Sequence, residues 1–283
     1  MQIDHFILVT YINSIFFMTT KRLWFHLDNF QASLAMFLSM AFLVYLPNQL
    51  ATKLIASTFN IPTRFDFFRI NFLIPDNSPL WTSESIITVY LAGPLISLAF
   101  GLYFKYLHFR HTKRPGKLKL FFLWGWVHGY LQFFGSIIVG TLVLDGLGFV
   151  IEWMYIPLIV KLILVLLSLL TLLRLGMVAN MEFLRIAPNH SMLKKPFKLK
   201  FFAAIVPSIV GLVIFFILKF PDNSIYSVFI NLLVLLILAP IMVLKSHEAR
   251  LFKEQDFASF SWGYWVFAFI VIAASYATIY FLN

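Results

Sequence analysis

The sequence predicts an all-α protein, a bundle of about eight transmembrane helices, and three observations lead to this prediction. Of the 283 residues, 61% are hydrophobic and only 12% are charged, whereas a soluble domain carries about 25% charged residues. Apolar runs close to the length of about 20 residues that a spanning helix needs recur along the chain. Basic residues gather between alternate runs. Because the backbone in a bilayer must satisfy its own hydrogen bonds, each run is expected to be a helix.

The expected spans are eight apolar runs at 5–20, 30–46, 86–107, 121–144, 156–180, 201–218, 226–244 and 264–282. The first run is short, and its basic residues, Lys21 and Arg22, follow it instead of preceding it. A cleavable signal peptide has the opposite order, so this run is expected to be a retained helix. A seven-span alternative places the first run along the membrane interface.

Basic residues occupy every second connection, as eight spans require. They follow the first, third, fifth and seventh runs, at 21–22, 110–119, 185–200 and 245–253. Loops rich in Lys and Arg stay in the cytoplasm, so these connections are expected there, both chain ends outside, and the protein in a bacterial inner membrane. These basic loops account for the net charge of +10, so the charge does not indicate nucleic-acid binding. Membrane lipids are the expected partners.

The longest outer connection, 62–85, carries Pro62, Pro75, Pro79 and Trp81 among apolar residues such as Phe65, and it is expected to fold against the membrane face. The absence of cysteine excludes disulfides and thiolate metal sites. No internal repeat or linker divides the chain, so 1–283 is expected to form one transmembrane domain.

The fourth run carries polar residues at mid-membrane depth. His128 and Gln132 are four residues apart and share one helix face. Intramembrane polar groups often mark functional sites, but a central helix whose polar groups bond to its neighbours also explains them. A single mid-membrane histidine is too few for a haem, and no cofactor is expected. The run also contains two small-xxx-small pairs, which let helices approach closely: Gly125 with Gly129, and Ser136 with Gly140.

Three short segments resemble the site-2 protease family of intramembrane zinc metalloproteases. That family has an HExxH helix with two zinc-binding histidines and a catalytic glutamate, then an AGP-containing helix, then an LDG segment whose aspartate is the third zinc ligand. The matching segments here are Asn48-Gln49-Leu50-Ala51-Thr52, Ala92-Gly93-Pro94 and Leu144-Asp145-Gly146. The resemblance covers 30–144 and leaves 156–282 as an additional four-helix portion.

The departures from the family pattern decide what the resemblance implies. Asn48 and Thr52 stand at the histidine positions, Gln49 stands at the glutamate position, and Asp145 is retained. A catalytic zinc needs about three strong protein ligands, and a glutamine cannot act as a general base. The resemblance therefore implies a protease-like scaffold without bound metal or protease chemistry. The same residues also fit a polar helix end after Pro47, a kinked helix at 93–94 and an interfacial turn at 145–146.

The resemblance leads to an expected function, a non-catalytic scaffold that binds a membrane partner. Another protein's transmembrane segment would enter the groove that held substrate, with Asn48, Gln49, Thr52 and Asp145 as its polar floor. The alternative is a transporter or lipid-handling protein with a polar path formed by His128, Gln132, Asp145 and Glu152. An enzyme with an unrecognised site is the third possibility, although the sequence displays no evident nucleophile–base pair.

Overall fold

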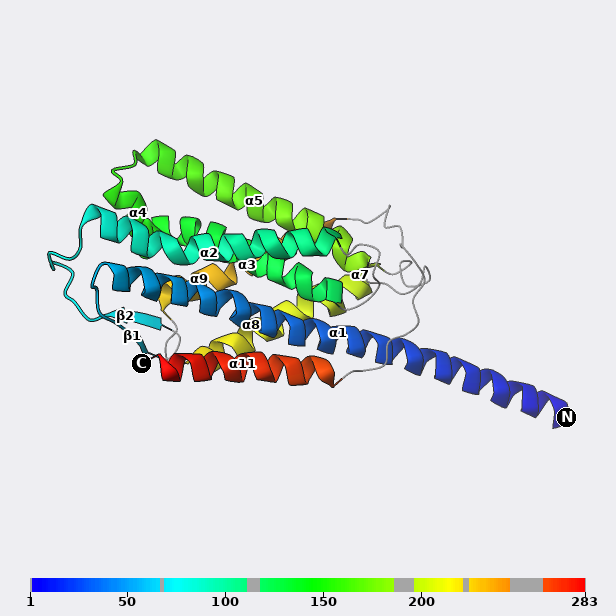
Figure 1. Ribbon diagram of the computed structural model, residues 1–283. Coiled ribbons are helices and arrows are strands. Elements are labelled where there is room, and N and C mark those ends of the chain that lie inside the picture. Colours follow the sequence, from blue (N-terminus) through cyan, green and yellow to red (C-terminus); the bar gives the residue numbers. More distant parts are fainter. Residues whose placement is uncertain are drawn as a thin grey trace.

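A computed structural model of the protein describes residues 2–66, 69–110, 118–185, 196–220, 224–244 and 262–282. It is a bundle of long helices with a small two-stranded sheet at one end (Figure 1). The helical elements are α1 (Gln2–Thr58), α2 (Ser83–Arg110), α3 (Leu118–Val143), α4 (Leu147–Trp153), α5 (Leu158–Leu184), α7 (Pro196–Lys200), the π-helix η1 (Phe201–Ile205), α8 (Val206–Lys219), α9 (Ile225–Leu232), α10 (Val234–Val243) and α11 (Gly263–Phe281).

The protein is a multi-pass membrane protein, and the predicted all-α bundle is confirmed. Within the described residues, seven helical stretches are long and apolar enough to cross a membrane. Two of them combine shorter elements, because α7, η1 and α8 follow one another without a break and α9 leads into α10. The stretches in α1 and α3 are the most buried, at 72% and 61%, whereas those in α5 and α11 are only 17% and 22% buried. Thus α1 and α3 form the centre, and α5 and α11 present most of their surface to lipid.

The first two expected spans are not separate helices, and this part of the prediction is wrong. The 57-residue helix α1 runs through Lys21 and Arg22 without a turn and continues past Leu46 to Thr58. The reason is local: positions 2–46 contain neither glycine nor proline, so nothing in that stretch favours ending a helix. As a result the two marked chain ends lie at opposite ends of the molecule (Figure 1), not on one side as expected.

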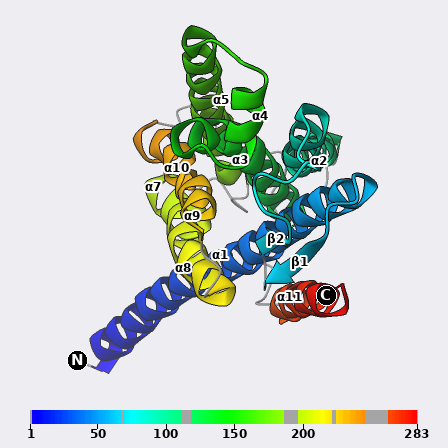
Figure 2. The same cartoon turned by 90° about the vertical axis from the view of Figure 1, so that its left-hand side faces the viewer.

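The connection between α1 and α2 contains an antiparallel hairpin that was not predicted. Strand β1 (Thr63–Asp66) pairs with β2 (Arg69–Phe72), and Phe65 lies opposite Ile70. Both of these side chains are buried, so one face of the hairpin packs inward. The hairpin lies beside the end of α1, close to the last turn of α11 (Figure 2). We call this end of the molecule the hairpin end, and the opposite end, where α2 ends and α3 begins, the basic end.

Glycines set the distances between the central helices. A Cβ atom on Gly129 would lie 2.4 Å from the Cα atom of Gly101, so α2 and α3 cross almost backbone to backbone. Gly125 faces the ring of Phe104, and Gly140 packs against Gly148 in α4. Three of the four residues in the predicted small-xxx-small pairs therefore lie at close contacts between elements.

Candidate functional site

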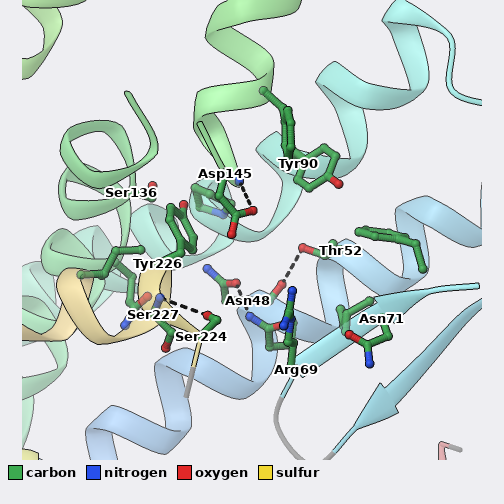
Figure 3. Close-up of a pocket in the computed structure, with 18 of the residues that line it drawn as sticks. Asn48, Thr52, Arg69, Asn71, Tyr90, Ser136, Asp145, Ser224, Tyr226 and Ser227 are labelled. Carbon is green, nitrogen blue, oxygen red and sulfur yellow. Dashed lines mark hydrogen bonds between the residues drawn. The ribbon is translucent and has the colours of Figure 1, made fainter. Parts of the chain in front are cut away.

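A cavity of about 680 Å³ opens at the hairpin end of the bundle (Figure 3). Its walls come from the last third of α1, strand β2 and the segment after it, the first turns of α2, the end of α3, the turn before α4, and the start of α9. No single stretch of sequence forms it. The packing of α1, α2 and α3 brings the motif segments to the same place.

The α1 wall of the cavity carries Asn48, Gln49 and Thr52. The Asn48 amide donates to Ser97 Oγ in α2 over 2.8 Å, and its oxygen accepts from Gln49 Nε2 over 3.2 Å. A Cβ atom at Gly93 would lie 2.7 Å from both Asn48 Oδ1 and Thr52 Oγ1. The lack of a side chain at Gly93 therefore allows α2 to approach α1 closely, with the side chains of Asn48 and Thr52 packed between the two helices.

Asp145 extends from the turn between α3 and α4 into the same cavity (Figure 3). Its Oδ1 accepts a 2.7 Å hydrogen bond from the backbone N–H of Gly146, and the residue is half-buried. Gly146 has φ 55°, in the left-handed region where glycine is favoured. A side chain there would also collide with Tyr226, whose ring would come within 2.5 Å of its Cβ. The Asp145-Gly146 pair thus forms a tight turn whose carboxylate faces the cavity.

An aromatic cluster forms another part of the wall and was not predicted. The rings of Trp81 and Tyr90 stack with centroids 6.0 Å apart, and Phe72 lies 5.1 Å from Trp81 in an edge contact. Phe149 of α4 lies 5.2 Å from Tyr90. Strand β2 adds Arg69 and Asn71 to the lining. The aromatic content of the connection is visible in the sequence, but its place in the cavity depends on the hairpin.

The α9 wall is held by a buried lysine. Ser224 caps α9 by accepting from the Ser227 backbone N–H, and Ser227 Oγ accepts from Lys219 Nζ over 2.6 Å. Lys219 is fully buried, and its Nζ lies 4.1 Å from the centre of the Tyr45 ring. A hydroxyl and a ring face together favour the ammonium group in this apolar setting.

The structure brings most of the motif positions together. Asn48, Gln49, Thr52, Pro94, Asp145 and Gly146 all line the cavity, and Gly93 packs directly behind Asn48. The polar helix end expected after Pro47 does not occur, because α1 continues to Thr58. The helix α2 likewise continues through Gly93 and Pro94. The turn expected at Asp145 and Gly146 is present.

The four residues of the predicted polar path do not form one. Gln132 and Asp145 line the cavity, and Gln132 Nε2 donates to Asn231 over 3.4 Å. His128 is only 2% exposed, lies 4.5 Å from the ring of Phe37, and has no hydrogen-bond partner for either ring nitrogen within the described chain. Glu152 pairs with Lys161 at the surface. His128 therefore belongs to the aromatic core, and the cross-helix hydrogen bonds expected for it are absent.

A second polar cluster lies at the basic end, far along the helices from the cavity. Glu182 of α5 accepts from His108 Nε2 of α2 over 2.9 Å and also pairs with Arg185. The His108 Nδ1 atom lies 3.1 Å from the backbone oxygen of Lys119, the second residue of α3. Glu182, with only 3% of its side chain exposed, connects the end of α5 to the end of α2, and His108 connects both to the start of α3.

The chemistry that the cavity offers is recognition of polar and charged groups. At the motif positions it presents two amides, one hydroxyl and one carboxylate, which are not the ligand set of a catalytic zinc. Across the described ranges, no group of three or more His, Cys, Asp or Glu residues is placed to hold a metal ion. Comparisons with protein-family models, with curated proteins and with solved structures find no match to this chain.

Proposed function

We propose that this protein is a non-catalytic binding protein of the membrane, built on a site-2-protease-like core, and that its cavity holds part of a membrane partner. The observation that carries the proposal is the convergence of three motif segments, far apart in sequence, around one cavity. At the positions where the family has its catalytic groups, this chain has Asn48, Gln49 and Thr52. These side chains can bind polar groups but cannot hold zinc or activate water.

The size of the cavity limits what it holds. At about 680 Å³, it falls within the range of roughly 300–1,000 Å³ typical of small-ligand sites. A whole spanning helix is too large for this space. A bound transmembrane segment would insert only the few side chains at its end, and a lipid would insert its headgroup. Lipid handling is therefore the second candidate function, favoured by this volume and by a position at the end of the spanning helices.

A photo-crosslinking residue at Gln49 tests whether the cavity holds a membrane partner. Gln49 lines the cavity, whereas Leu54 on the same helix is 65% exposed and points away from it. We expect irradiation of intact membranes to give a defined adduct, to a protein or a lipid, from position 49, and only scattered lipid adducts from position 54. The defined adduct should weaken when Asp145 is replaced by alanine. Indistinguishable adducts from positions 49 and 54 would refute the proposal.

The absence of protease chemistry has a separate test, the metal content of the purified protein. We expect less than stoichiometric zinc in both the unaltered protein and the Asp145→Ala variant, measured by mass spectrometry after purification without chelators. The reason is that Asp145 is the one conventional zinc ligand among the motif positions. Stoichiometric zinc that disappears in the variant would show a working metal site and would overturn the non-catalytic assignment.

A further inference from the structure

Three charged residues line the cavity, Asp145, Asp76 and Arg69, and no ion pair joins them within the described part of the chain. Asp145 and Arg69 both belong to the lining, and Figure 3 shows both side chains at the cavity, one from the turn before α4 and one from the hairpin. Within the described part of the chain, neither forms an ion pair, and the carboxylate accepts only the Gly146 N–H. A half-buried carboxylate retains most of its hydrogen-bonding capacity in this position.

The surroundings of the two charges differ. Asp145 shares the cavity with the Asn48 amide oxygen on the α1 wall, which accepts from Gln49. Arg69 lies on the hairpin, with Asn71 two residues further along the same strand and therefore on the same face. Tyr90 lies within electrostatic reach of Asp145, Asp76 and Arg69. The cavity thus offers a cation site at Asp145 on the bundle and an anion site at Arg69 on the hairpin, with Asp76 on the segment after the hairpin and an aromatic wall beside them.

We propose that the cavity recognises a zwitterion in which a primary ammonium group faces Asp145 and a phosphate faces Arg69. An ammonium group donates three hydrogen bonds, which suits a carboxylate with neighbouring acceptors. A guanidinium binds a phosphate through two parallel hydrogen bonds. The ethanolamine phosphate unit carries both groups a few bonds apart, either as a phospholipid headgroup or as a free solute. The inference rests on the proposed function, because it names the ligand class of the same cavity.

The charge arrangement discriminates between headgroups. An anionic lipid without an amine leaves Asp145 unpaired and places its own charge near that carboxylate. A trimethylammonium group cannot donate hydrogen bonds, so it loses the contacts that Asp145 and Asn48 offer. A primary ammonium with a phosphate satisfies both sides of the cavity.

Native mass spectrometry of the full-length protein in detergent tests this proposal. The probes are short-chain phosphatidylethanolamine, phosphatidylglycerol and phosphatidylcholine, together with soluble phosphoethanolamine. We expect phosphatidylethanolamine to bind at least about tenfold more tightly than the other two lipids, a difference of about 1.4 kcal/mol. Asp145→Asn and Arg69→Gln should each weaken this binding about tenfold. The matched controls, Glu84→Gln and Arg64→Gln, alter exposed charges outside the lining and should leave it unchanged.

The outcomes distinguish a lipid headgroup from a free solute as the ligand, and they distinguish this inference from the proposed function. Binding of the lipid alone identifies a membrane headgroup, and binding of phosphoethanolamine alone identifies a soluble zwitterion; both support the inference if Asp145 and Arg69 are required. Equal binding of phosphatidylcholine or phosphatidylglycerol, or no effect of the two variants, overturns it. Each variant's melting temperature shows that it is folded, and Arg69→Lys should retain part of the affinity. If no zwitterion binds while position 49 still crosslinks to a protein, this inference fails and the proposed function stands.

Discussion

Among the described residues, Glu182 and Glu152 form ion pairs in opposite surroundings. Glu182 has 3% of its side chain exposed and binds His108 and Arg185, whereas Glu152 has 57% exposed and binds Lys161. A buried carboxylate that loses its charge leaves its partners unsatisfied in a medium without water, and this is costly. An exposed carboxylate exchanges its partner for water with little loss.

The prediction at the scale of single residues follows from this contrast. We expect Glu182→Gln to lower the free energy of unfolding by about 3 kcal/mol, and Glu152→Gln to lower it by at most about 1 kcal/mol. Thermal melting of the two variants in the same detergent measures the difference. A melting temperature of Glu182→Gln equal to that of Glu152→Gln would show that the cluster at the basic end does not hold the three helices together.

At this scale the sequence identified part of the cavity and missed the rest for a physical reason. Asn48, Thr52 and Asp145 were expected to share a site from the spacing of the motif-like segments, and all three line the cavity. Arg69 and Ser227 were not, since one lies on a hairpin whose register depends on tertiary packing and the other is fixed by a buried lysine. For His128 the sequence left open a functional role or a place in a central helix, and in the structure aromatic rings surround it.

At the scale of elements, the α2–α3 crossing depends on a glycine contact. A Cβ atom at Gly129 would meet the backbone of Gly101 at 2.4 Å, and backbone cannot move aside as a side chain can. At Gly135 on the same helix, the nearest atom to a Cβ would be a methyl group of Ile230 at 3.2 Å. The same substitution therefore meets a rigid neighbour at one position and an adaptable neighbour at the other.

We accordingly expect Gly129→Ala to destabilise the protein by about 3 kcal/mol, the upper end of the usual cost of overpacking. Gly135→Ala should be nearly neutral, because the gain in helix propensity of about 1 kcal/mol offsets the small adjustment of Ile230. Thermal melting of both variants in one detergent provides the comparison. Equal melting temperatures would contradict the backbone-to-backbone crossing.

The boundaries of elements show what charge patterns in a sequence can and cannot indicate. The alternation of basic clusters correctly separates most of the spans, because loops at one end of the bundle share a composition. It misplaced a turn at Lys21 and Arg22, where the backbone has no residue that ends a helix. Charge indicates on which side a segment lies, but neither a basic pair nor a single proline fixes where a helix stops, since α1 continues past Pro47 and α2 past Pro94.

At the scale of the whole molecule, the two ends of the bundle are expected to face different compartments. The connections after α2, α5 and α10 start at the basic end, and the stretches 110–119, 185–200 and 245–253 contain 13 of the 22 lysine and arginine residues. By the rule that basic loops remain inside, we expect this end in the cytoplasm and the cavity on the outer side.

Because the chain has no cysteine, single introduced cysteines report this orientation directly. Tyr155 lies between α4 and α5 at the hairpin end and is 86% exposed; Trp262 precedes α11 at the basic end and is 72% exposed. We expect a membrane-impermeant maleimide to label Tyr155→Cys in intact cells, and Trp262→Cys only after the membrane is opened. The reverse pattern would place the cavity in the cytoplasm.

The cavity also has a place in the order of synthesis. Its walls include Asn48 from α1, Asp145 from the turn before α4 and Ser227 from α9, so a chain that emerges from the N-terminal end completes it only after most of the spans have entered the membrane. Until α9 arrives, the Gln132 amide lacks its partner Asn231, and the Asp145 carboxylate faces a cavity that is closed only by α1, α2 and the hairpin. Groups of this kind are costly to leave facing lipid. Insertion of the last third of the chain therefore encloses polar groups that were exposed in the nascent protein and completes the cavity.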